Sequence, residues 1–432
     1  MSLILAKASA PVFRMAAGFF LLGFLACGTS LQAAPLAADT QRTLDLDALI
    51  ALSIQGHPSI GAARAQLGAA KAEVDAARSQ YYPSPSIQVL QSRAGISTIL
   101  TLQQPLWAGG RLDATLNAAQ SRSSGAEVSI NAAQYTLALR VTAAWAAWAQ
   151  ARGRAQSLEK GVTLLTVYTE SVLRRIAGGA AGEVDRELVA ARLAQTQGDL
   201  ESARFAERSA LGRLAQMTGQ PLRSQNLADP SLAEDANGSA PALPALAALV
   251  TQAMAHSAAL KRLQADIEAA QHETQQKRSA LWPTLNLRAQ HQRGDSTTTG
   301  MSASGSRLLL ALEYSPGAGL SAGANIDAAK ARVLALQENL QAARRELTET
   351  VTTDYEDYQA AGARKQTTQS MIQANAQVLA AYDRLFVAGK RSWLDVINAA
   401  RELIQAQTAL ADVSAQQVGT RARLRLHAGE TP

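Results

Sequence analysis

The side chains that most often carry out chemistry are scarce in this chain. Cysteine occurs once, as Cys27, and no strand–Ser–helix elbow or Gly-rich phosphate loop with Lys and Ser or Thr is present. The five histidines, none of which has metal-ligand spacing to another or to the cysteine, are His57, His256, His272, His291 and His427. We therefore expect no enzymatic activity, no metal and no cofactor.

The polar residues with informative spacing follow a glycine turn in the second half. Arg391 precedes Asp395 by four residues, and Asn398 follows Asp395 by three. Residues three or four apart share one face of a helix, so these side chains can project together. The alternative for Asp395 is a solvated acid at a helix start after Ser392, and for Arg391 a plain surface charge.

These residues belong to a chain that repeats its own plan. Each half has a helical segment, a Pro mark, two short alternating segments, a Gly mark and a very long helix. Pro83 and Pro283 are 200 residues apart, and Gly109 and Gly317 are 208 apart. A repeat of this length indicates one structural unit used twice.

The long segments predict helices of unusual length. Residues 111–177 and 325–387 contain no proline, and at about 1.5 Å per residue each would span roughly 100 Å. A short glycine-containing break follows each one, at Gly178 and at Gly389, and a returning helix comes next, over 183–217 and 392–426. Each half therefore predicts a long antiparallel helix hairpin.

The short segments, 84–107 and 284–314, predict two strand pairs. Each strand has about the eight to eleven residues that a tilted strand needs to cross a membrane. Aromatic residues stand at the strand ends, where a membrane barrel has its interfacial girdle: Tyr81, Tyr82, Trp107, Trp282 and Tyr314. The alternative, a pair of soluble hairpins, would leave open edges in water. Four strands are too few to close a barrel, so closure would require several chains.

The N-terminal segment is typical of export. Lys7 and Arg14 precede an apolar run and small residues, so residues 1–33 predict a signal peptide cleaved after Ala33. Cys27 would then be removed with it; the alternative is that Cys27 is a lipidation site. The formal net charge of +6 includes these two cations, and the remaining charges are mixed along the helices, which argues against nucleic-acid binding.

With this plan in view, the chain resembles the TolC family of outer-membrane channel proteins over nearly its whole mature length. Residues 104–111 read Gln-Pro-Leu-Trp-Ala-Gly-Gly-Arg, and residues 386–399 read Phe-Val-Ala-Gly-Lys-Arg-Ser-Trp-Leu-Asp-Val-Ile-Asn-Ala. The resemblance implies a mainly α fold with a membrane β-barrel portion. Three protomers would give one twelve-stranded barrel in the outer membrane and a long α-helical barrel in the periplasm.

The resemblance also implies roles for the two tips. In the family, residues past the second turn line the periplasmic entrance, an Arg latches it, and two acids form charged rings. The matching residues are Arg391, Asp395 and Asn398, and the amide departs from the doubly acidic pattern. Residues expected to contact a periplasmic adaptor are Gly178, Gly179, Gly182, Asp185, Gly389, Lys390 and Ser392.

The resulting organisation is a signal peptide (1–33), a first repeat (34–219), a linker (220–244) and a second repeat (245–432), with the helix hairpins at 111–217 and 325–426. We expect a homotrimeric exit duct that works with an adaptor and an inner-membrane ABC or proton-driven transporter. The tip residues resemble most the branch that serves type I secretion of proteins such as adhesins. The alternatives are multidrug or metal efflux, and a secreted helical scaffold without a pore.

Overall fold

The computed structural model describes residues 43–92, 95–180, 182–228, 243–294, 304–315, 317, 319 and 321–430. The predicted signal peptide, Cys27 and most of the predicted linker lie outside these residues. The described helices include none with the combination of length and apolar character needed to cross a membrane.

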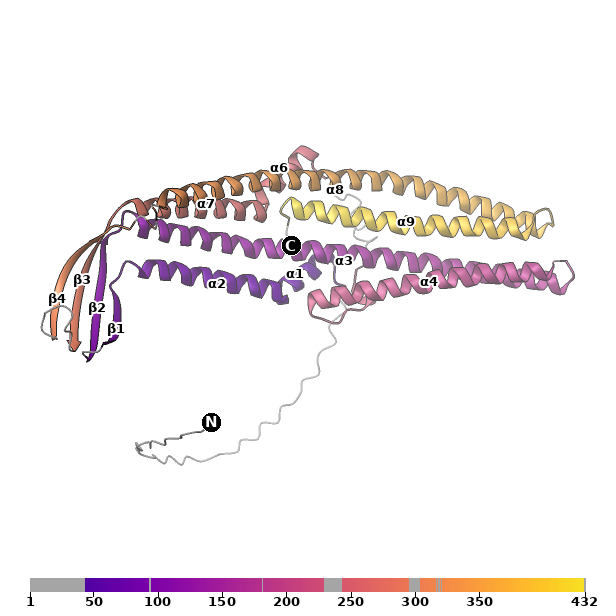
Figure 1. Ribbon diagram of the computed structural model, residues 1–432. Helices are drawn as coiled ribbons and strands as arrows, with labels where there is room; N and C mark the ends of the chain where they lie inside the picture. The colour runs from indigo at the N-terminus through magenta and orange to yellow at the C-terminus, as the bar shows by residue number, and fades with distance from the viewer. Residues whose placement is uncertain are drawn as a thin grey trace, which may run out of the picture. The chain divides into compact units, whose positions relative to one another are not determined.

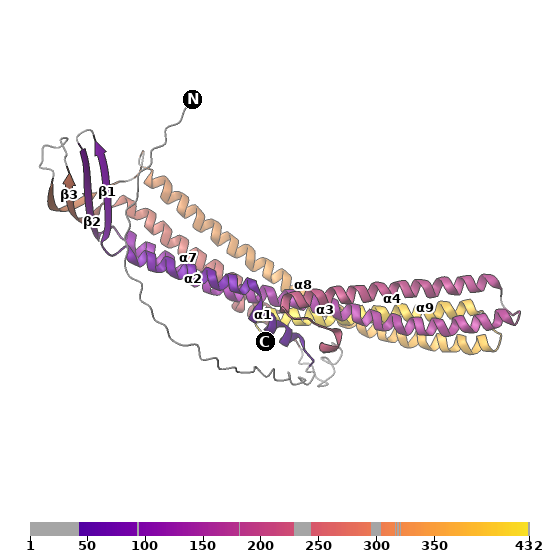
Figure 2. The same ribbon diagram turned by 90° about the horizontal axis from the view of Figure 1, so that it is seen from below.

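Two long helices run through the described part of the chain: α3 (Arg111–Ala177) and α8 (Ala322–Val387). Helix α2 (Pro58–Ser79) packs along the first part of α3, and α4 (Glu183–Thr218) returns along its second part. In the second half, α7 (Ala258–Arg278) and α9 (Trp393–His427) relate to α8 in the same way. Figures 1 and 2 show the resulting plan from two sides, in which the shorter helices follow one another beside a continuous long helix.

The segment before each strand pair is two helices rather than one. Helix α1 (Leu46–Gly56) ends at His57, which caps α2 by accepting a hydrogen bond from Ser59 N at Nδ1 (3.2 Å). Helix α6 (Leu246–His256) ends before Ser257, whose hydroxyl accepts from Leu260 N at the start of α7 (3.3 Å). The two repeats therefore share this capped break between helices as well as their overall plan.

The two repeats meet along α3, which packs against both α7 and α9 of the second repeat. Helices α3 and α9 approach closely at small residues. A Cβ on Gly153 of α3 would lie 2.9 Å from Cβ of Ala411 on α9, so this crossing requires a residue without a side chain. Apolar clusters fill the space beside it. Trp148, Leu214 and Leu426 belong to one of the two largest, together with Leu227 from the start of the predicted linker.

The four strands form one antiparallel sheet in the order β1-β2-β3-β4. They are β1 (Ser84–Ser92), β2 (Gly95–Trp107), β3 (Thr284–Gly294) and β4 (Ser304–Glu313). Strand β2 of the first repeat pairs with β3 of the second, so the duplication is joined inside the sheet. Within the described residues β1 and β4 have no outer neighbour, which leaves both edges of the sheet open.

Candidate functional site

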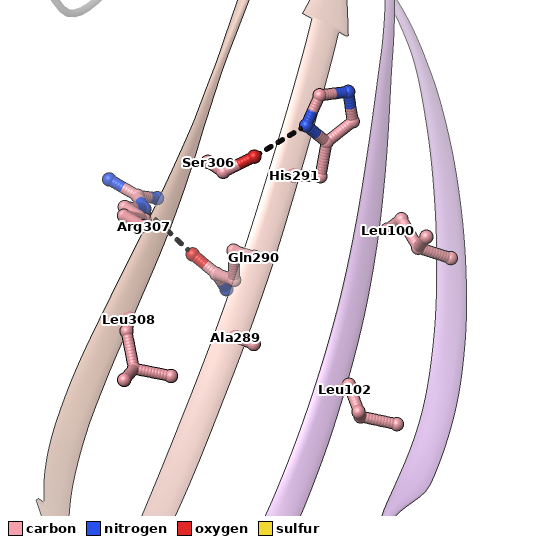
Figure 3. A pocket seen from close by; sticks show the side chains of 8 residues that line it. All are labelled: Leu100, Leu102, Ala289, Gln290, His291, Ser306, Arg307 and Leu308. Carbon is pink, nitrogen blue, oxygen red and sulfur yellow. Dashed lines mark hydrogen bonds between the residues drawn. The ribbon is translucent and has the colours of Figure 1, made fainter.

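One face of the sheet is polar and cross-linked by side-chain hydrogen bonds. Arg288 of β3 donates to Gln103 of β2 (3.1 Å) and to Glu313 of β4 (2.5 Å). Arg307 of β4 donates to Gln290 of β3 (2.9 Å), a contact drawn in Figure 3. Side chains along a strand alternate between faces, and residues opposite one another share a face. The polar residues therefore face the same side.

The other face is apolar and open. Leu100 of β2 stands between Ile87 of β1 and His291 of β3 on this face. Its large apolar side chains, 46–69% exposed, are Ile87, Val89, Ile96, Leu100, Leu102, Leu308, Leu310 and Leu312. Leu90, Leu309 and the half-buried Ile99 are exceptions, since their register places them on the polar face. A bare apolar face opposite a polar hydrogen-bonded one is what a strand between lipid and an aqueous lumen requires.

The apolar residues form a band that crosses the strands obliquely. In β1 the apolar pair is Ile87 and Val89. Two strands away, at the same levels of the sheet, β3 has the polar residues His291 and Arg293. In β3 the apolar residues lie nearer the helices, at 285, 287 and 289. Barrel strands are tilted by about 35–45° from the barrel axis. An apolar band parallel to the membrane therefore crosses neighbouring strands at successively shifted residues. Figure 3 shows His291 beside Ser306, with Nδ1 and Oγ 2.9 Å apart, where the band of β3 and β4 ends.

The sheet brings the five expected interface aromatics to one end. Tyr81 and Tyr82 precede β1, Trp107 ends β2, Trp282 precedes β3 and Tyr314 follows β4. Because neighbouring strands are antiparallel, all of these positions lie at the end joined to the helices. Four of the side chains are 45–65% exposed, and Tyr81 is half-buried. They therefore gather at the boundary between sheet and helices, and their role at a membrane interface stays a prediction.

A glycine at this boundary explains one feature of the 104–111 motif. Trp107 and Trp282 meet edge to face, with ring centroids 6.4 Å apart. Gly109 lies against Trp282 with φ of +58°, and a Cβ there would lie 2.7 Å from Cβ of Trp282. Both the left-handed backbone and the space require glycine. The residue fixes the turn that connects β2 to α3.

The two tips, at the far ends of the helix hairpins, have the same backbone conformation and hydrogen bonds. At the first, Gly178, Gly179 and Ala180 donate to the carbonyls of Arg174, Ile176 and Arg175. At the second, the same three bonds recur 210 residues later in the chain, with donors at 388–390 and acceptor carbonyls at 384–386. Gly179 and Gly389 have φ of +71° and +72°, so each helix ends in a Schellman turn.

Arg391, Asp395 and Asn398 lie at the start of α9, and the structure brings the first two together. Arg391 Nη1 is 3.4 Å from Asp395 Oδ2, and its guanidinium stacks on Tyr382 of α8 at 4.8 Å. Ser392 caps the helix by accepting from Leu394 N, and Asp395 remains partly exposed. Asn398 is half-buried one turn farther along. Both contacts of Arg391 stay inside the second hairpin.

The tip residues expected to meet an adaptor are accessible. Asp185 is half-buried, and its carboxylate accepts a hydrogen bond from Gly182 N (3.1 Å). It occupies in α4 the position that Asp395 occupies in α9. The other expected contact residues are exposed: Gly178, Gly179, Gly182, Gly389, Lys390 and Ser392.

One polar cluster was not singled out from the sequence. Asp354 of α8, 7% exposed, accepts hydrogen bonds from Arg423 and from His427 Nε2 (3.2 Å) of α9. Nδ1 of His427 lies 2.6 Å from Tyr135 Oη on α3. The signal in the sequence is an acid in an apolar stripe, since Asp354 continues the helical spacing of Leu347 and Val351.

A family model defines the class of protein. The model described as "Outer membrane efflux protein" matches residues 49–220 and again 249–430, one match in each half. The chain therefore belongs to the outer membrane efflux protein family. No curated protein matches the chain.

Solved structures with the same fold cover nearly all of the chain. The outer membrane protein VceC from Vibrio cholerae superposes with a TM-score of 0.74 at 18% identity, over 89% of this chain and 96% of that one. The open-state MtrE outer membrane channel of Neisseria gonorrhoeae gives 0.73 at 16% identity, over 89% and 88%. The CmeC outer membrane channel of Campylobacter jejuni gives 0.72 at 15%, over 89% and 85%.

These matches confirm the resemblance to the TolC family that residues 104–111 and 386–399 carry. They also confirm the fold class, mainly α with a small sheet, which is the fold of the TolC-like channels, and an outer-membrane location that reaches into the periplasm. The chain is an outer-membrane efflux channel protein, and its family and structural relatives are channels rather than enzymes.

Proposed function

We propose that three copies of this chain form the exit duct of a tripartite export system. The observation that carries the proposal is the sheet, with its open edges, one exposed apolar face and one hydrogen-bonded polar face. Four strands cannot close alone, and threefold symmetry supplies twelve, which pairs β4 of one protomer with β1 of the next. The apolar face then meets lipid, and the polar face lines the lumen.

In this proposal the helix tips form the periplasmic entrance. Three copies of Asp395 around the axis would give a ring of carboxylates that attracts cations, and Asn398 would form an uncharged ring beside it. Arg391 braces the second hairpin through Tyr382 and Asp395. A periplasmic adaptor meets the exposed turns at Gly178–Gly179 and Gly389–Lys390, and its engagement opens the entrance.

The duct is passive, so an inner-membrane ABC or proton-driven transporter supplies the energy. We propose a type I secreted protein, such as an adhesin, as the substrate, because the residues around Gly389 resemble that branch. Efflux of drugs or metals is the second candidate, favoured by the description of the matching family model. Deletion of the gene should abolish secretion of a large protein in the first case and sensitise cells to drugs or metal salts in the second.

The experiment that tests the duct itself is the mass and shape of the protein extracted in detergent from outer membranes. An elongated trimer with a helical stalk of roughly 100 Å is expected. A monomer or dimer that is soluble in the periplasm or medium would overturn the duct and favour the helical scaffold.

A further inference from the structure

The two tips share an apolar cluster that includes Val172 and Phe386. Among the described residues, the hydrogen bond that joins the first tip to the second comes from the side chain of Arg175. This residue is in the last turn of α3, and its Nη2 donates to the carbonyl of Phe386 at 2.8 Å. Phe386 is in the last turn of α8, which belongs to the other repeat. Among the described residues, the next hydrogen bond between the two hairpins is about five helical turns away, from Ser157 to Gln407 (3.4 Å).

The chemistry of this contact is favourable in two ways. The guanidinium lies 3.8 Å from the centroid of the Phe386 ring, so a cation–π contact accompanies the hydrogen bond. The carbonyl is also one of the last of α8, where the helix dipole concentrates negative charge. Phe386 is 4% exposed and Arg175 is half-buried, so water competes weakly for this cation.

Arg175 also holds its own tip. Its backbone carbonyl accepts from Ala180 N at 2.8 Å, the bond that closes the first Schellman turn. The carbonyl of Phe386 likewise accepts from Gly389 N at 3.0 Å within the second turn. A single residue therefore bonds the first turn with its main chain and the second turn with its side chain. The matching residue of the second repeat, 210 positions later, is Leu385. Its side chain has no hydrogen-bond donor, so it cannot make the equivalent bond from the second tip to the first.

We propose that Arg175 is a positioning residue that couples the two tips of a protomer, so that displacement of one turn is transmitted to the other. The inference rests on the proposed function in one respect, since it gives the coupling a role in opening the entrance. Arg391 has a different task, because its contacts hold α9 to α8 within one hairpin.

The test compares three variants of the full chain, extracted in detergent. Arg175→Ala removes the contact, and Arg175→Lys keeps a cation that can bond the carbonyl but loses the planar fork. Arg174→Ala is the matched control, because the neighbouring Arg174 is 71% exposed and its ion-pair partner is Glu170 on the same helix. Hydrogen exchange of the peptide covering 385–391 and closed-state conductance in planar bilayers are measured for each.

Loss of a hydrogen bond from a charged group should speed exchange of the 385–391 peptide roughly tenfold in Arg175→Ala. Closed-state conductance should rise in the same variant, Arg175→Lys should recover part of both effects, and Arg174→Ala should match wild type. Equal exchange in Arg175→Ala and Arg174→Ala would overturn the coupling. Exchange needs no conducting channel, so it decides the Arg175 contact even if the proposed duct fails.

Faster exchange with unchanged conductance would also overturn the proposal, because Arg175 would then stabilise the turn without positioning the entrance. Exchange of the buried segment around Val351 is followed in the same samples. Protection there at the wild-type level shows that the fold is intact, and Arg175→Lys supplies the decisive comparison if Arg175→Ala loses that protection.

Discussion

Arg423 holds the carboxylate of Asp354 from the next helix, with Nη2 2.6 Å and Nε 3.0 Å from Oδ1. His427 approaches Oδ2 of the same carboxylate and also contacts Tyr135. The cluster ties the C-terminal end of α9 to α8 and to α3 of the other repeat. It lies away from both tips and the sheet, so its contribution is to the stability of the helices.

We expect Asp354→Asn to lower the free energy of unfolding by about 3 kcal/mol, because the cation of Arg423 would remain half-buried without its partner. Denaturant unfolding of the extracted protein, followed by circular dichroism, measures the change. Asp327→Ala is the control, since Asp327 pairs with Lys330 on an exposed surface and should cost less than about 1 kcal/mol. Equal losses in the two variants would contradict a buried-pair contribution.

The same carboxylate predicts a dependence on acid. Burial raises the pKa of Asp354, but hydrogen bonds from His427 and Arg423 outweigh it, so the pKa lies below its usual 3.8. A carboxyl with a lowered pKa stabilises the fold above the unfolded value, and the contribution is lost as pH falls below about 4. Wild type should therefore lose its advantage over Asp354→Asn in that range. An advantage that stays constant from pH 7 to pH 3 would contradict the assignment.

Much of the fold was predictable because it depends on local patterns. Absence of proline over 111–177 and the glycine breaks at 178 and 389 define long helices and their turns without knowledge of tertiary contacts. The breaks at His57 and Ser257 were harder, because a single capping residue interrupts an otherwise helical pattern. The pairing of β2 with β3 follows from neither strand alone.

The polar contacts that join the two repeats could not be predicted from local patterns. Arg175 reads as an ordinary cation in a last helical turn, and its partner is a backbone carbonyl 211 residues away. Asp354 differs, since an acid in an apolar stripe signals a buried partner, but nothing in the spacing identifies Arg423. The faces of the sheet were visible only in part, because the oblique band appears once the register is known.

The turn at Gly109, between β2 and α3, gives a prediction on packing. Gly109→Ala should destabilise the fold by more than Gly110→Ala, although both glycines have positive φ. Gly110 has open space around its Cβ position, so its substitution adds backbone strain of about 1–2 kcal/mol alone. Gly109→Ala adds the clash with Trp282. Thermal unfolding of the extracted protein compares the two, and equal shifts would contradict the close approach.

For the proposed entrance, Asp395→Ala should weaken block by Mg²⁺ in bilayer recordings by roughly tenfold or more. Each carboxylate near a cation contributes about 1 kcal/mol even in water, and a threefold ring loses three of them. Asp185→Ala is the matched control, because Asp185 has the same place after the first turn. An unchanged Mg²⁺ response in Asp395→Ala, in a protein that still forms trimers, would exclude Asp395 from the entrance.

The last prediction concerns Arg391. It distinguishes the contacts of Arg391 within the second hairpin from the contact of Arg175 between the two hairpins. The exposed ion pair of Arg391 with Asp395 and its stacking on Tyr382 together contribute about 1 kcal/mol. If these contacts hold the entrance shut, Arg391→Ala should raise closed-state conductance roughly fivefold. Lys390→Ala, next to it in the exposed turn, is the control and should leave the closed state unchanged. The double variant Arg391→Ala with Arg175→Ala should multiply the two effects, since the residues share no contact. A double variant no leakier than either single one would mean that both act on the same contact.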